Sequence, residues 1–349
     1  MSKSTIADVA RLAKVSASSV SNVLNDRSNR MRPDTKERIQ HVIEQLGYTP
    51  NLAARQLKTG HAPIIGLIVP SVANPFYGIF ARLIEKAALT GGYQVLLGNS
   101  ERDPARERRY AEELWGYGVR GIIFGSSLTQ FTHLESLIKK GLHVVAFDRP
   151  TQQDDKVIID SISVDNVQAT RLTTKHLLAL GHHRIGFVSG PIRTVSRLDR
   201  LEGYRGSLQD ANREIDQQLG WQGETSNLGD TAAVELGRQG AHDLLSKPKP
   251  ATAIIAINDM YAFGVYAGAR DLGLKVPDDV SVTGVDDITL TEVVEPPLTT
   301  VQQPLRDITR LAVERLINRL HDTCSHPPGH QTLPPKLIVR KSTARYQKS

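Results

Sequence analysis

From Ile64 onward, short apolar runs that suit β-strands alternate with segments whose apolar residues recur at helical spacing. The run IIGLIV precedes the amphipathic segment PFYGIFARLIEKAAL, and the alternation continues through GIIFGSS, HVVAFDR, RIGFVSG and TAIIAIND to VSVTGVD. This pattern predicts an α/β fold of βαβ units on parallel sheets. Two doubly wound lobes fit the length better than one very wide sheet. A last strand, KLIVR, is expected after a stretch punctuated by prolines.

The N-terminal segment, residues 1–62, differs because it shows helical periodicity and no strand signal. Thr5 and Asp8 have the spacing of a capping box that opens a helix over residues 6–13. Ser16 is a good N-cap for a second helix over residues 17–24. Two short helices joined by a tight turn predict a helix-turn-helix, whose second helix enters the major groove of DNA.

A third helix is expected over residues 33–46. Pro33 is favoured in the first turn of a helix, and Gly47 is a plausible stop because glycine readily adopts the left-handed conformation.

The net charge of the chain is concentrated in this segment. The formal charge of +6 looks too small to indicate nucleic acid. Residues 1–62, however, hold ten basic and five acidic side chains, whereas the remaining residues hold 33 basic and 32 acidic ones. This distribution indicates that the N-terminal segment contacts a polyanion and that the rest does not.

The second helix exposes short polar and small side chains that can contact DNA. Asparagine pairs with adenine, serine contacts several base edges, and alanine can contact a thymine methyl. The candidates for base contacts are Ala17, Ser18, Ser21 and Asn22. Short polar groups suited to phosphate contacts are Thr5, Ser16, Ser19, Ser21 and Asn25. The alternative is that this serine-rich face is merely solvated.

Several motifs occur in one order along the chain: TIADVARLAKVSASSVSNVLN, RPDTKERIQHVIEQLGYTPNLAARQLKTG, IGLIVPSVANPFY and a final LIVRKST. In these motifs the chain resembles the lactose-repressor/galactose-repressor (LacI/GalR) family of bacterial transcription regulators over almost its whole length. The resemblance implies a helix-turn-helix domain over residues 1–47, a hinge over 48–62, and a two-lobed effector-binding and dimerisation domain over 63–349 that is similar to periplasmic binding proteins.

The resemblance also implies a hinge that becomes helical on operator DNA and inserts a leucine into the minor groove. Leu57 occupies that place here, and an apolar side chain there can unstack a base step at a cost of roughly a few kcal/mol. The alternative is that Leu57 only anchors the linker. The hinge candidates for DNA contact are Tyr48, Asn51, Ala54, Leu57 and Lys58. The lactose repressor has larger side chains in place of Ala17 and Ser18 and arginine in place of Asn22, so the operator should differ.

The resemblance and the local chemistry place an effector site at the carboxyl ends of strands. Asn74, Phe76 and Tyr77 follow the first strand and resemble the N-P-F-[FY] segment of sugar-binding relatives. An aromatic face can pack on the apolar side of a pyranose while an amide binds its hydroxyls. Ordinary packing in a first helical turn is the alternative for both aromatic residues.

Further effector candidates are charged or polar side chains near other strand ends. They are Ser126, Arg149, Arg200, Asn258, Asp259 and Asp286. Arginine presents a planar fork of donors to vicinal hydroxyls or a carboxylate, and aspartate can accept two sugar hydroxyls. Arg200 could equally be a surface charge, and Asp259 could equally be the N-cap of the helix that follows it. The lactose repressor has tryptophan near the place of Thr231 and arginine in place of Leu198, so a lactose-type ligand is doubtful.

Other classes of site find little support. The G-x-G-x-x-G pattern at residues 116–121 follows a helix and precedes a strand, the reverse of a dinucleotide fingerprint. No P-loop, H-E-x-x-H or G-x-S-x-G motif occurs. The single cysteine, Cys324, excludes an intramolecular disulfide and any multi-cysteine metal site. We therefore expect no enzyme activity, cofactor or metal.

The expected partners follow from these points. Apolar runs are too short to span a membrane, and no secretory signal is evident, so a cytoplasmic location is expected. A solute-binding receptor would share the two-lobed body, but the basic helical segment argues against it. No leucine heptads follow Leu320, so we expect a homodimer on a pseudo-palindromic double-stranded operator, controlled by a small effector such as a sugar. The family resemblance implies a repressor, and the identity of the effector stays open.

Overall fold

The computed structural model divides the chain into two compact units, residues 1–62 and 63–349. It describes all residues except 1–3, 25–30, 49–62, 225–231, 324–325 and 348–349. Among the described residues, no helix is both long and apolar enough to cross a membrane.

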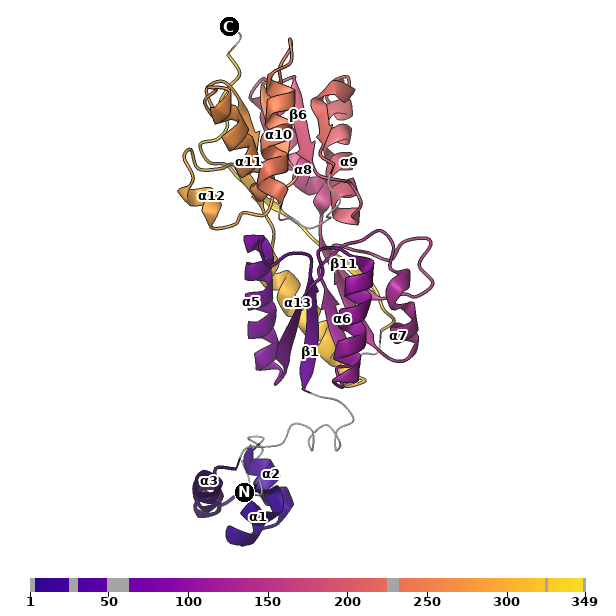
Figure 1. The fold of residues 1–349 in the computed structure, drawn as a ribbon, viewed down its shortest axis with the longest axis vertical. Helices are drawn as coiled ribbons and strands as arrows, with labels where there is room; N and C mark the ends of the chain where they lie inside the picture. The colour runs from indigo at the N-terminus through magenta and orange to yellow at the C-terminus, as the bar shows by residue number, and fades with distance from the viewer. Residues whose placement is uncertain (1–3, 25–30, 49–62, 225–231, 324–325, 348–349) are drawn as a thin grey trace. The chain divides into compact units, whose positions relative to one another are not determined.

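The N-terminal unit is a small bundle of three helices, as expected (Figure 1). They are α1 (Ile6–Leu12), α2 (Ala17–Leu24) and α3 (Pro33–Leu46). The capping box is confirmed, because Thr5 Oγ1 accepts from the Asp8 N–H and Asp8 Oδ2 accepts from the Thr5 N–H. Gly47 ends α3 in the left-handed conformation, with φ of 54°. The three helices bury one shared core that includes Val9, Ala13, Val20, Val23, Ile39 and Val42.

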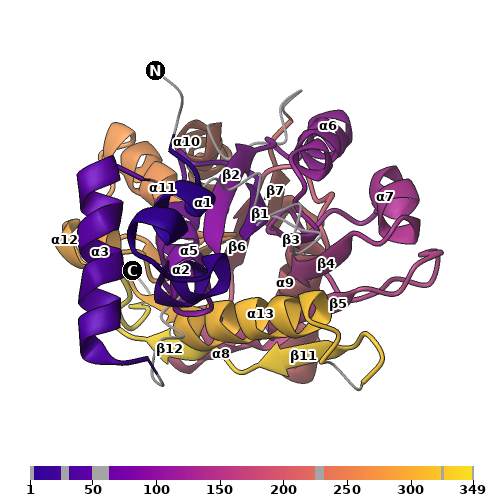
Figure 2. The ribbon, with the colours of Figure 1, turned by 90° about the horizontal axis from the view of Figure 1, so that it is seen from below.

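The first lobe of the body has a six-stranded parallel sheet. Its strands, in spatial order, are β11 (His330–Leu333), β5 (Asp160–Val164), β4 (His143–Phe147), β3 (Gly121–Phe124), β1 (Ile64–Val69) and β2 (Gln94–Asn99). One face packs on α5 (Pro75–Thr90) and α13 (Leu305–Leu320). The other packs on α6 (Pro104–Gly116), the short helix η1 (Thr132–Leu134) and α7 (Glu135–Lys139) (Figure 2).

The second lobe has a four-stranded parallel sheet. Its order is β7 (Gly220–Gln222), β6 (Ile185–Ser189), β8 (Ala253–Ala256) and β9 (Ser281–Thr283). Its helices are α8 (Asn166–Ala179), α9 (Val195–Asp210), η2 (Gln217–Leu219), α10 (Ala233–Leu245), α11 (Asp259–Asp271) and α12 (Leu290–Val293). Helices α10 and α11 approach so closely that a Cβ atom on Gly264 would lie 2.0 Å from the carbonyl oxygen of Val234. The predicted pair of doubly wound lobes is confirmed.

The path of the chain between the lobes was not predicted. The chain leaves the first lobe after β5, returns to it between β10 (Thr300–Gln302) and α13, and leaves it again between β11 and β12 (Lys336–Ile338). Strands β10 and β12 form a small antiparallel sheet. The expected last strand is therefore present, and α13 completes the first lobe from a distant part of the sequence.

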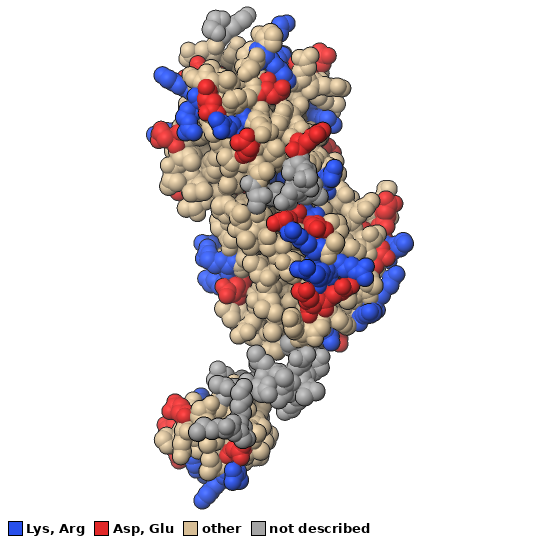
Figure 3. Space-filling view, in the orientation of Figure 1, with Lys and Arg blue, Asp and Glu red and all other residues tan. Residues whose placement is uncertain are grey.

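The charges on the body are of mixed sign. In the space-filling view, basic and acidic side chains are interspersed over both lobes (Figure 3). On α6, for example, Arg108 pairs with Glu112 and Arg109 with Glu113. This mixing agrees with the nearly balanced charge of the body.

Candidate functional site

The second helix of the N-terminal unit turns its predicted contact face outward. Ala17, Ser18 and Asn22 are exposed, whereas Val20 and Val23 are buried against the other helices. Ser19 and Ser21 are half-buried. The helix therefore presents its small and polar side chains on the face that is free to meet a partner, and its valines fix its orientation.

Two of the predicted phosphate contacts already have partners within the unit. Thr5 Oγ1 donates to Asp8 Oδ2 at 2.7 Å, and this contact lowers the pKa of the Asp8 carboxyl. Ser16 caps α2, because its Oγ accepts from the Ser19 N–H at 3.2 Å. Both hydroxyl groups remain exposed at helix starts, where backbone N–H groups favour an anion.

The hinge candidates fall mostly outside the described residues. Tyr48 is half-buried and packs against the core of the three helices. Asn25, Asn51, Ala54, Leu57 and Lys58 lie outside the part of the chain that the structure describes. Their expected contacts with DNA stay predictions.

Side chains from both lobes enclose a cavity at the carboxyl ends of the two sheets. The space has a volume of about 30 Å³. Six of the predicted effector residues line it: Asn74, Phe76, Tyr77, Arg200, Asn258 and Asp286. The sequence analysis missed further lining residues, which are Arg102, Phe147, Asp148, Ser196, Arg197, Ile257 and Gln303.

The second lobe contributes a buried arginine beside a carboxylate. Arg200, on α9, donates from Nε to Asn166 Oδ1 at 2.8 Å and from Nη1 to the Ile257 carbonyl at 2.7 Å. Its Nη2 lies 3.8 Å from Asp286 Oδ1, which also accepts from Gln303 Nε2 at 2.7 Å. These contacts hold an arginine fork and a carboxylate in fixed positions at the cavity wall.

The first lobe contributes aromatic side chains from the start of α5. Asn74 is the N-cap of this helix, and its Oδ1 accepts from the Phe76 N–H at 3.1 Å. The Phe76 ring stacks against Phe147 with 6.0 Å between ring centroids. Tyr77 accepts a hydrogen bond from Arg102 through its hydroxyl. Phe76 and Tyr77 thus pack in the first helical turn and also line the cavity, so the two interpretations of these residues are compatible.

Asp148 is a buried carboxyl group in this cavity. Burial raises its pKa to about 6, although Arg200 and Asn166 oppose the shift. Its Oδ1 accepts from the Val164 N–H at 3.0 Å. Asp148 follows β4 directly, so the strand-end rule that selected Asp286 could have found it.

Arg149 does not line the cavity, and the structure argues against its predicted ligand contact. Nη1 and Nη2 each donate to the Asp155 carboxylate at 2.7 Å, and Nε donates to the Leu128 carbonyl. Nη2 of Arg149 also donates to the Thr129 carbonyl at 3.1 Å. Its donors are therefore engaged in holding the loop that follows β4.

Asp259 and Ser126 also lie away from the cavity lining. Asp259 is fully buried, and it accepts from the Ile288 N–H at 3.0 Å and from Thr300 Oγ1 at 2.5 Å. The alternative N-cap role is wrong, because Asn258 caps α11 and Asp259 is its first residue. Ser126 is buried after β3. Through these two hydrogen bonds Asp259 holds the segments on either side of Asp286 in place.

Among the described residues, no group of His, Cys, Asp and Glu side chains is arranged to hold a metal ion. The chemistry available in the cavity is therefore that of arginine, aspartate, amide and aromatic groups, which bind polar small molecules through hydrogen bonds and stacking.

The comparisons with known proteins cover both units. Residues 5–51 match the model of bacterial regulatory proteins of the lacI family, and residues 174–343 match the periplasmic binding protein-like domain. The HTH-type transcriptional regulator DegA of Bacillus subtilis (strain 168) is 34% identical over 342 residues, which cover 98% of each protein.

Solved structures agree with these matches. The lac repressor dimer bound to operator and the anti-inducer ONPF has a TM-score of 0.82 at 28% identity, covering 98% of this chain and 100% of that one. A complex of the transcriptional regulator CelR with cellobiose has a TM-score of 0.72 at 28% identity, covering 97% and 99%.

Proposed function

Because this chain belongs to the lacI family of bacterial regulatory proteins and is a ligand-controlled DNA-binding transcriptional regulator, we propose that a sugar or related polyol binds between its lobes and changes its affinity for operator DNA. The observation that carries the proposal is the buried pair of Arg200 and Asp286 opposite Phe76. Arginine donates to hydroxyl oxygens, aspartate accepts from hydroxyl groups, and the aromatic ring packs on the apolar face of a pyranose.

The size of the cavity supports control through movement of the lobes. Ligand pockets commonly measure about 300–1,000 Å³, whereas the space between the lobes is about 30 Å³. A sugar can enter only if the lobes separate or their side chains rearrange. A ligand that binds one arrangement more tightly than the other shifts the population between them, with a coupling of about 1–3 kcal/mol between sites. The CelR complex contains a sugar, cellobiose, in a related fold.

For the DNA-binding unit we propose that α2 reads the operator through Ala17, Ser18 and Asn22. These side chains are exposed on one helix whose other face is buried. Asn22 is suited to adenine and cannot provide the guanine contact of an arginine. The expected operator therefore differs from that of a regulator with arginine at this place.

We further propose that the chain acts as a homodimer. Apolar side chains are exposed on the edge strand β2, where Leu96 and Leu97 are 40% and 50% exposed, and on α12, where Val293 is 72% exposed. Helices α12 and α5 lie toward the same side of the body in Figure 1. Burial of such side chains against a second copy would stabilise a two-fold dimer, which suits a pseudo-palindromic operator.

The effector proposal is tested with the variant Asp286→Ala. The operator is first selected from random-sequence DNA, and the effector is found by a thermal-shift screen of sugars, sugar phosphates and nucleobases. Operator affinity is then measured by fluorescence anisotropy with and without that compound. We expect Asp286→Ala to bind operator as the wild type does and to lose the response to the compound.

The matched control is Asp210→Ala, which removes an exposed carboxylate from the same lobe. This control should keep the full response. If Asp286→Ala retains the response, the cavity is not the effector site. If it loses operator binding without ligand, Asp286 supports the fold instead.

A further inference from the structure

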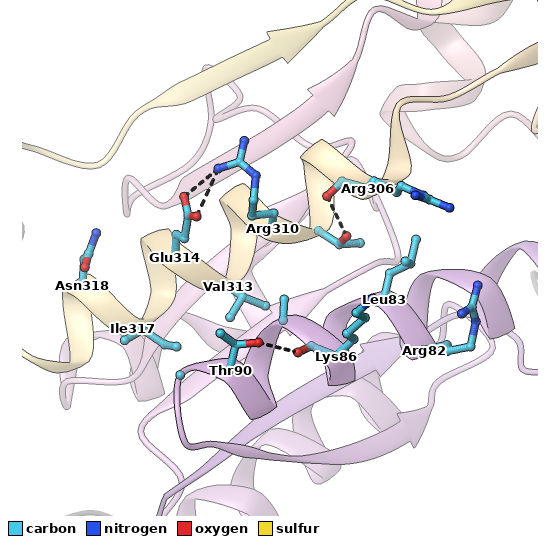
Figure 4. A pocket seen from close by; sticks show the side chains of 13 residues that line it. Arg82, Leu83, Lys86, Thr90, Arg306, Arg310, Val313, Glu314, Ile317 and Asn318 are labelled. Carbon is cyan, nitrogen blue, oxygen red and sulfur yellow. Dashed lines mark hydrogen bonds and ion pairs between the residues drawn. The ribbon is translucent and has the colours of Figure 1, made fainter. Parts of the chain in front are cut away.

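A groove on the first lobe lies between α5 and α13, outside the cavity between the lobes. Its volume is about 590 Å³, which falls in the range of about 300–1,000 Å³ that is common for small-ligand pockets. Figure 4 shows the two helices side by side, with Leu83 of α5 directed toward α13. The helices are distant in sequence and meet because α13 returns to this lobe.

The floor of the groove is apolar. Leu83 and Ala87 come from α5, and Val313 and Ile317 come from α13. Val313 is buried, and the other three side chains are half-buried. An apolar body placed on this floor would remove these side chains from water, which favours binding.

The walls of the groove carry an excess of positive charge. Arg82, Lys86, Arg306 and Arg310 line it, against the single acidic residue Glu314. Arg310 is neutralised by Glu314 at 3.0 Å and lies 3.6 Å from Asp307. Within the described part of the chain, the charged groups of the other three basic residues form no ion pair or hydrogen bond. They are available to an anion from both helices.

We propose that this groove binds a small organic anion, with its apolar body on the floor and its phosphate or carboxylate group between Arg82 and Arg306. Several cations around one apolar floor select such an amphipathic molecule over a neutral one, because charge-assisted hydrogen bonds to arginine add to burial of the body. The site is distinct from the effector cavity.

The groove continues toward the effector cavity along shared segments. A second hollow of about 470 Å³ is lined by Arg82, Leu83 and Arg306 and also by Phe76, Asp286 and Gln303. The last three of these residues line the cavity between the lobes as well. An anion in the groove therefore contacts the helix and the segment that supply Phe76 and Gln303 to the effector site.

The test is calorimetric titration of the full chain with phenyl phosphate, phenylacetate and inorganic phosphate. We expect saturable binding of phenyl phosphate or phenylacetate, and the tighter of the two identifies the preferred anionic group. The double variant Arg82→Ala/Arg306→Ala should weaken that binding by about tenfold or more, because it removes two charged donors. Inorganic phosphate should bind more weakly, because it lacks an apolar body.

The matched control is Arg108→Ala/Arg109→Ala, which removes two exposed arginines from α6 and should leave binding unchanged. This titration uses no effector and no operator, so a failure of the groove can be distinguished from a failure of the effector proposal. The proposal is overturned if no organic probe saturates, if both double variants bind equally, or if inorganic phosphate binds as tightly. It is also overturned if Arg82→Ala/Arg306→Ala changes the sedimentation coefficient but leaves probe binding unchanged, since a second copy of the chain would then cover the groove.

Discussion

The buried carboxyl group of Asp259 allows a sharp test of how the effector site is supported. It accepts from the Ile288 N–H at 3.0 Å and from Thr300 Oγ1 at 2.5 Å, and it is fully buried. Burial and the neighbouring Asp286 carboxylate raise its pKa well above the ordinary value. Gly284 permits this approach, because a Cβ there would lie 2.3 Å from Asp259 Oδ1.

Removing the carboxyl group should destabilise the body. In Asp259→Ala the Ile288 N–H and the Thr300 hydroxyl lose their acceptor, at a cost of about 1–3 kcal/mol each. We therefore expect the free energy of unfolding to fall by about 2–6 kcal/mol. In Asp259→Asn the amide oxygen can accept from Ile288 while the amide N–H donates to Thr300 Oγ1. The asparagine variant should therefore lose much less stability than the alanine variant.

The dependence on pH separates the charge of Asp259 from its hydrogen bonds. Because the folded-state pKa is raised above the unfolded value of 3.8, the folded protein holds this proton more tightly. The stabilisation is fully present below that value and is lost as the pH rises through the folded-state pKa, by at most about 1.4 kcal/mol per pH unit. Asp259→Asn should remove this part of the pH dependence.

The assay is urea unfolding of wild type and both variants between pH 4 and pH 8. Two results would refute the reasoning. One is an alanine variant within about 1 kcal/mol of the wild type, a difference smaller than the loss of one buried acceptor. The other is an asparagine variant whose stability falls with pH as steeply as that of the wild type.

Three further predictions concern the cavity, the hinge and the dimer. Burial raises the pKa of the Asp148 carboxyl to about 6, so the stabilisation that comes from holding this proton should be lost as the pH rises from 3.8 through about 6. In urea unfolding, Asp148→Asn should therefore make the free energy of unfolding less dependent on pH over this range. An unchanged slope would contradict this. Leu57→Ala should weaken specific operator binding much more than non-specific binding in anisotropy titrations, whereas equal losses would refute an inserted leucine. Leu97→Asp with Val293→Asp should give monomers in analytical ultracentrifugation, and an unchanged dimer would place the interface elsewhere.

The order of strands and helices could be predicted, but the pairing of distant segments could not. The short helices of the N-terminal unit follow from local signals such as the Thr5 capping box and Gly47. The helix α13 also has apolar residues at helical spacing, including Ile308, Ala312 and Leu316, which are buried. Nothing in that pattern says that it packs on α5, because the return to the first lobe is a property of the tertiary fold.

For single side chains, too, the sequence could not tell which of two chemically similar residues lies at the cavity. Arg149 and Arg200 offer the same chemistry, and the sequence supported both. Asp155, in the loop six residues after Arg149, engages the Arg149 guanidinium, whereas Arg200 lies at the cavity. Asp259 and Asp286 both follow apolar strands, and only burial and hydrogen-bond partners distinguish the supporting carboxyl group from the one at the cavity wall. Which side chains form ion pairs or hydrogen bonds with one another leaves no periodic pattern in the sequence, so it could not be predicted there.

The connection between the two units constrains how an effector signal can reach DNA. Strand β1 begins at Ile64, directly after the N-terminal unit, and ends at Val69, shortly before Asn74 at the cavity. Its six residues span about 20 Å. All but the first are buried between the helices of both faces, and close packing leaves such a strand little room to deform. We therefore expect the effector to act by moving whole lobes about the segments that join them, with β1 carrying that movement to the hinge as a rigid element.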